Sequence, residues 1–203
     1  MGLRQLFGPS KDEIWSQLSQ EIEADYQPGG FFSSGKVVLT HKQWEITLDT
    51  YTVSDGKTSH TYTRIRAPYV NQDGFRFNIY RKSIFSGLGK LLGMQDVEIG
   101  DAFFDEEFII QGQPEDQVRR LLQNVDVCQR IQNQPNIHFQ VKGDEGWFGQ
   151  KFPEGVDELY FETYGVIKDK QRLKDLFDLF AVVLEDLCRI GSAYENEPGV
   201  SLR

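Results

Sequence analysis

Two arginines on one predicted strand are the side chains of this 203-residue chain best suited to holding an anion. Arg64 and Arg66 alternate with Ile65, so both point to the same face of the strand, together with Tyr62. Two guanidinium groups side by side can hold a carboxylate or a phosphate through charged hydrogen bonds. The acidic run at 96–107 offers an internal partner for them, so an anion site and internal ion pairs both remain open.

Three carboxylates of that acidic run are candidate general bases: Asp96, Asp101 and Asp105. If they share a cleft with the two arginines, the arrangement favours a hydrolase-type enzyme that acts on an anionic substrate. The run lacks the alternating ligands and the closing glutamate of a calcium loop. The three histidines are scattered and show no metal-ligand spacing. We therefore predict no metal and no cofactor.

The sequence lacks the motifs of a phosphate-binding loop and of a catalytic serine nucleophile. The Gly-x-Gly-Lys segment ending at Lys90 has neither the earlier glycine nor the following Ser or Thr of a phosphate-binding loop. A Gly-x-Ser-x-Gly nucleophile elbow is absent from the sequence. Cys128 and Cys188 fall on the apolar faces of predicted helices and are expected to be buried free thiols. The leading interpretation is a non-catalytic ligand-binding or protein-interaction module, with the hydrolase-type enzyme as the alternative.

Two apolar features bear on binding. Trp147 and Phe148 lie in a glycine-rich loop at 143–155, which forms either a lid over a pocket or a plug at the edge of the core. The apolar stripe at 84–92 packs on the sheet, or else contacts a partner groove or a membrane surface. A peripheral membrane contact therefore stays open. The predicted ligand-binding residues are Arg64, Arg66, Asp96, Asp101, Asp105, Trp147 and Phe148.

Composition and charge limit which cellular location and which classes of binding partner we expect for this protein. The 15 Phe, 8 Tyr and 3 Trp suffice to build a core. The net charge is −9, and all of it arises from residues 101–203, since residues 1–100 hold equal numbers of acidic and basic side chains. An acidic surface repels phosphate backbones, which disfavours nucleic acid. The chain has neither an apolar run long enough for a membrane span nor an apolar N-terminal signal, so we expect a cytoplasmic protein with an unknown protein or small-molecule partner.

The order of predicted elements indicates an α+β fold with a largely antiparallel sheet, made of a meander and a later strand pair and covered by three helices. Ser10 and Glu13 form a capping box at the start of the first helix, and Pro114 opens the second. The meander strands are 37–39, 43–53, 59–69 and 75–82, followed by short strands at 96–100 and 108–112 and the pair 137–141 and 159–167. The helices are 10–26, 114–132 and 169–190. We predict a single domain at 1–190 and a disordered tail at 191–203.

The segment 93–122 resembles an uncharacterised bacterial family that carries a Phe-Asp-x-x-Phe motif, here Phe104, Asp105 and Phe108, before a helix that ends in Leu121 and Leu122. Some of its members are membrane-anchored. The resemblance implies no activity. Read from the residues themselves, Phe104 and Phe108 are an i, i+4 pair, and Asp105 is expected to accept hydrogen bonds from backbone N–H groups at a helical turn.

Overall fold

A computed structural model describes residues 8–30, 34–84, 96–143, 152–200 and 202. The strands are β1 (Asp25–Gln27), β2 (Lys36–His41), β3 (Trp44–Ser54), β4 (Ser59–Asn71), β5 (Arg76–Arg81), β6 (Phe108–Gln113), β7 (His138–Lys142), β8 (Val156–Tyr164) and β9 (Ala193–Tyr194). The helices are α1 (Lys11–Glu21), α2 (Ala102–Glu107), α3 (Glu115–Leu122), α4 (Val125–Gln132) and α5 (Lys170–Arg189), and a short 3₁₀ helix spans Lys82–Ile84.

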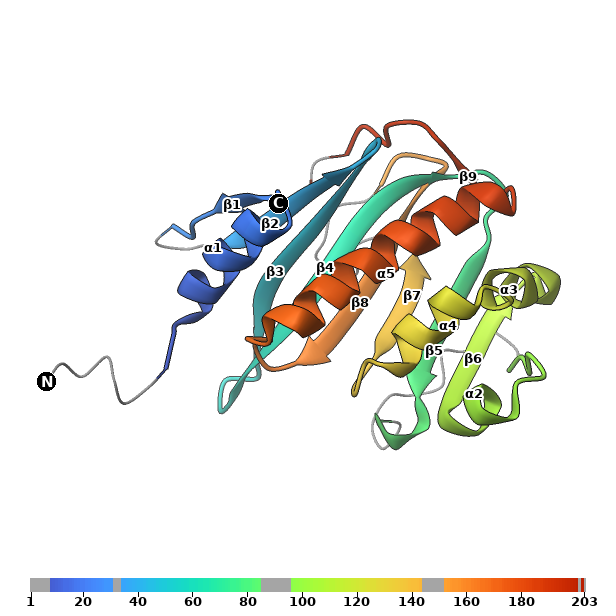
Figure 1. Cartoon of the computed structure of the whole chain (residues 1–203), viewed down its shortest axis with the longest axis horizontal. Helices are drawn as coiled ribbons and strands as arrows, with labels where there is room; N and C mark the ends of the chain where they lie inside the picture. The colour runs from blue at the N-terminus through green and yellow to red at the C-terminus, as the bar shows by residue number, and fades with distance from the viewer. Residues whose placement is uncertain (1–7, 31–33, 85–95, 144–151, 201, 203) are drawn as a thin grey trace, which may run out of the picture.

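All of these strands join one antiparallel sheet in the order β1-β2-β3-β4-β8-β7-β5-β6, with β9 also paired to β4 (Figure 1). The predicted α+β class and antiparallel sheet are confirmed. One row of directly opposed apolar side chains crosses seven strands, and every one of them is buried or nearly so. Its members are Val37, Leu48, Ile65, Phe161, Phe139, Ile79 and Ile110.

The helices α1, α4 and α5 lie over one face of the sheet (Figure 1). This face carries the apolar row, because Phe180 of α5 contacts Phe139. The Ser10 capping box at α1 is formed, as predicted, and the Asp169 side chain caps α5 by accepting the N–H of Arg172. The indole N–H of Trp15 in α1 donates to the carbonyl of Ile167, 3.1 Å away, which ties α1 to the start of α5. Phe180 in the middle of α5 packs edge-on against Phe139 of the apolar row. The core is therefore a single layer between the sheet and its helices.

The predicted meander is wrong in its fourth strand. The strands β2, β3 and β4 are neighbours as expected, but β8 and β7 lie between β4 and β5. The turn residues at 71–74 specify that the chain reverses, which is a local property. Which strand pairs with β4 is not a local property. It depends on which later strand completes the apolar row, and that strand is β8.

Three further segments differ from prediction. The expected helix at 114–132 is two helices, because the Asn124 side chain accepts the N–H of Asp126 and starts α4 afresh. The expected strand at 96–100 is reduced to a bridge between Asp96 and Gln111. The tail expected to be disordered contains β9, and Leu202 is buried. Cys128 and Cys188 are free thiols, the first buried and the second half-buried.

Candidate functional site

The face of the sheet opposite the apolar row is lined with polar side chains, and we call it the polar face. Residues directly opposed on neighbouring strands share a face of the sheet. Two rows of such residues cross the polar face. The first contains Asp49, Arg64, Glu162, His138 and Tyr80, and the second contains Thr47, Arg66, Tyr160, Gln140, Asn78 and Gln111.

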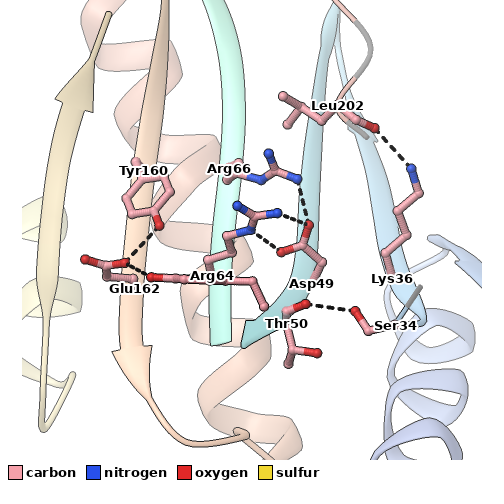
Figure 2. A network of polar contacts seen from close by, with 10 residues as sticks. Ser34, Lys36, Asp49, Thr50, Arg64, Arg66, Tyr160, Glu162 and Leu202 are labelled. Carbon is pink, nitrogen blue, oxygen red and sulfur yellow. Dashed lines mark hydrogen bonds and ion pairs between the residues drawn. The ribbon is translucent and has the colours of Figure 1, made fainter. Parts of the chain in front are cut away.

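Arg64 and Arg66 converge on one carboxylate, that of Asp49 on β3 (Figure 2). Arg64 binds it through two nitrogens, Nε at 2.5 Å and a terminal nitrogen at 3.1 Å. Arg66 donates to Asp49 Oδ2 over 2.6 Å, and its side chain is only 1% exposed. The carboxylate expected for these arginines therefore comes from the neighbouring strand and not from the acidic run.

The acidic run has local structural roles instead. Asp101 caps α2 by accepting the N–H groups of Phe103 and Phe104. Asp105 accepts the N–H groups of Ile99 and Gly100, as expected, while Phe104 stacks on Phe108. These bonds hold the loop before α2 against the start of β6.

The structure does not bring the arginines and the candidate bases into one cleft. Asp96 bridges to Gln111 on β6, and β8, β7 and β5 separate that strand from the arginines of β4. At a spacing of about 4.8 Å between strands, the separation is on the order of 20 Å. Trp147, Phe148 and the 85–92 part of the apolar stripe lie outside the described residues.

A chain of hydrogen bonds joins the two ends of the polar face. Glu162 Oε2 accepts the hydroxyl of Tyr160 at 2.9 Å (Figure 2). The same oxygen accepts the hydroxyl of Tyr51 at 2.6 Å. Its other oxygen lies 3.4 Å from His138 Nδ1. The chain continues from His138 to Asn78 and from Asn78 to Gln111, and it ends at Asp96.

Sequence reasoning missed Asp49, Tyr51 and Glu162. A signal for them exists, because each alternates with core residues on its own strand and so belongs to the face opposite the core. What the sequence lacks is the order of the strands. Glu162 meets Tyr51 only because β8 lies next to β4.

Hydrogen bonding controls the ionisation of this cluster. Burial alone raises the pKa of Glu162, but the bonds from His138, Tyr51 and Tyr160 and the charge of Lys142 outweigh burial and lower the pKa to about 2. Burial, followed by the nearby Glu162 carboxylate, raises the pKa of both Tyr51 and Tyr160 well above the ordinary tyrosine range. Glu162 is therefore ionised, and both tyrosines keep their protons, over the whole physiological range.

The low pKa of Glu162 predicts a specific loss of stability in acid. Because its folded-state pKa is about 2, against 4.5 as the ordinary value, its contribution is complete above about pH 4.5 and is lost as pH falls towards 2. That contribution is about 3 kcal/mol. Urea melts from pH 7 to pH 2.5 should show a steeper decline for the wild type than for Glu162→Gln. The exposed Glu106→Gln is the control and should follow the wild type. Parallel declines in the wild type and Glu162→Gln would contradict the assignment.

Three tyrosines gather where the polar face meets the β3–β4 hairpin, and we call them the tyrosine cluster: Tyr51, Tyr62 and Tyr164. Tyr51 stacks on Tyr62 with ring centres 5.3 Å apart, and Tyr164 meets Tyr62 edge-on at 5.7 Å. Tyr164 is 70% exposed. Arg64 lies over the Tyr51 ring at 5.0 Å, which links the cluster to the Asp49 ion pairs.

The described part of the chain contains no group of three or more His, Cys, Asp or Glu side chains placed to hold a metal ion. None of its helices combines the length and the apolar character that crossing a membrane requires.

The comparisons with known proteins show a structural likeness. No family model matches the chain, and no curated protein sequence matches it. The chain is similar to the crystal structure of the mycobacterial trehalose monomycolate transport factor A, TtfA, with a TM-score of 0.56 and 8% sequence identity, over 91% of this chain and 97% of that one. The likeness is one of fold. It covers nearly the whole of both chains.

Proposed function

We propose that this protein is a non-catalytic binding module that engages a partner through the tyrosine cluster at the rim of its polar face. The observation that supports this most directly is that the Tyr164 ring is exposed to solvent while it packs against Tyr62, which in turn stacks on Tyr51. Tyrosine is enriched among residues that dominate binding energy, because it offers a large, rigid contact area with a polar tip.

The state of the charged groups on the polar face supports binding over catalysis. A general base works best with a pKa near the operating pH. The pKa of Glu162 is about 2, and the pKa values of Tyr51 and Tyr160 are raised far above neutrality. Arg64 and Arg66 are bound to Asp49. The groups beneath the tyrosine cluster thus act as a rigid support.

The structural neighbour agrees with a role of this kind. TtfA is described as a transport factor for trehalose monomycolate. For the present chain we infer only a role as an accessory protein that binds a partner. The hydrolase-type alternative draws no support from this geometry, since its arginines and its bases lie on opposite sides of β8, β7 and β5.

The proposal is tested by affinity capture from native extract with Tyr164→Ser. The wild type should enrich a partner reproducibly, and Tyr164→Ser should lower its recovery at least tenfold, as expected for about 1.4 kcal/mol or more lost at a binding hot spot. The matched control is Val125→Ser, because Val125 is also exposed and apolar but belongs to α4 on the other face. Equal recovery with Tyr164→Ser and the wild type, or no partner at all, would overturn the proposal.

A further inference from the structure

A second site lies on the polar face away from the tyrosine cluster, at the point where the pairing between β3 and β4 ends. The β3–β4 register ends with Thr47 opposite Arg66. The same edge of β4 is taken up again by β9 from Val70 onward. Pro68 lies in the gap between these pairings, and proline has no N–H to continue a ladder. The sheet is therefore open at this point.

A pocket of about 250 Å³ occupies the gap. One wall comes from the β2–β3 hairpin, with Thr40 and Glu45 directly opposed on the polar face. The opposite wall is the segment 197–200, which follows β9. Lys36 Nζ donates to the Leu202 carbonyl at 3.2 Å, just beyond this wall, and Leu202 is buried, so the wall is anchored at its end (Figure 2).

The hairpin turn carries an unused donor beside this pocket. Gln43 lines it, and the Nε2 of Gln43 is buried without a hydrogen-bond partner among the described residues. Burying an amide donor without a partner is unfavourable. The turn is held in place because Glu185 of α5 binds both His41, at 2.7 Å, and Lys42, at 3.1 Å. Lys42 also has a φ of 53°, which is uncommon for a residue other than glycine.

The lining groups define what can bind. Gln43 Nε2 requires an acceptor, whereas the carboxylates of Glu45 and Glu197 require donors. An ammonium group only donates, and a phosphate or carboxylate only accepts, but a hydroxyl group does both. The Lys42 ammonium is bound to Glu185, so the pocket is acidic and disfavours anions. Pro68 and Val200 add apolar surface for C–H groups.

From these features we propose that the gap between β3 and β4 binds a small polyhydroxylated molecule of about the size of one sugar ring. A hydroxyl accepts from Gln43 Nε2, and other hydroxyls donate to Glu45 and Glu197. The volume lies below the roughly 300–1,000 Å³ typical of pockets for drug-sized ligands, which limits the ligand to one ring. This inference goes beyond the proposed function and does not depend on the tyrosine cluster.

The test is an NMR titration of the full chain with defined probes: D-glucose, D-galactose, D-mannose and myo-inositol, followed by glucosamine and glucose 6-phosphate. At least one neutral probe should shift the Gln43 side-chain NH₂ signal and the Thr40 and Gly199 amides with saturation. The phosphorylated sugar should bind more weakly than its neutral parent. Gln43→Leu should weaken binding by about tenfold, as should Thr40→Val if Gln43→Leu fails to fold. The control is Gln171→Leu, because Gln171 is exposed on α5 away from the pocket.

The outcomes separate this inference from the proposed function. Absence of saturable shifts with every probe, tighter binding of the phosphate, or unchanged binding in Gln43→Leu would overturn the pocket assignment. Partner capture that depends on Tyr164 should persist in Gln43→Leu. If it does while the sugars fail, the pocket inference alone is wrong; if the sugars bind while capture fails, the tyrosine cluster proposal alone is wrong.

Discussion

Replacing Phe180 with alanine is expected to lower the free energy of unfolding by about 3–5 kcal/mol. Phe180 is fully buried in the middle of α5 and packs on Phe139 with ring centres 5.5 Å apart. Its neighbours one turn away, Leu176, Val183 and Leu184, are also buried. The truncation leaves a cavity that these well-packed neighbours cannot close. The loss is a large share of the roughly 5–15 kcal/mol that holds a typical domain folded.

Urea and thermal melts of Phe180→Ala and Asp178→Ala decide this prediction. Asp178 lies two residues earlier, on the exposed side of α5, and pairs with Arg130 at 3.2 Å. Arg130 keeps a second partner in Asp126, so Asp178→Ala should cost no more than about 0.5 kcal/mol. A Phe180→Ala protein that melts like the wild type would show that α5 does not cover the sheet.

Replacing Asp49 with asparagine is expected to cost about 3–5 kcal/mol. The substitution keeps the size of the side chain and removes the charge that Arg64 and Arg66 share. Both Asp49 and Arg66 are buried, at 6% and 1% exposed, so water cannot replace the lost carboxylate. Breaking a buried ion pair from one side leaves cationic groups in a medium of low polarity.

The matched control is Asp126→Asn, which makes the same chemical change at an ion pair on the surface. Asp126 binds Arg130 Nε at 3.0 Å, but half of the Asp126 side chain is exposed. This variant should cost less than about 1 kcal/mol. Equal urea midpoints for the two variants would refute the view that Asp49 supports the polar face from within.

How far the sequence predicts the fold depends on the range of the interactions involved. The ends of α1 and α5 follow from Ser10, Glu13 and Asp169, whose capping bonds span three residues or fewer. The break between α3 and α4 also has a local cause in Asn124, but the apolar positions on both sides continue one helical stripe and hide it. The sequence does not predict β9, because this strand depends on pairing with β4, more than 120 residues earlier.

In the candidate site, too, the sequence predicts what depends on neighbouring residues and does not predict what depends on distant ones. Alternation along β4 places Arg64 and Arg66 on one face, and the sequence alone is enough to predict that. Their partner could not be predicted, because Asp49 meets them only through the β3–β4 register. The acidic run is rich in charge, but its members Asp101 and Asp105 accept backbone N–H groups that are close to them in the chain.

By itself the sequence determined the α+β class, the faces of the strands and the capped ends of two helices, because these depend on periodicity and on contacts between near neighbours. Only the tertiary structure decided that β8 and β7 enter the sheet beside β4. That choice depends on completing a buried apolar row from residues 37 to 161. The same pairing brings Glu162 to Tyr51, and the gap left at Pro68 creates the pocket beside Gln43. Strand order is a property of the whole core, and no local pattern encodes it.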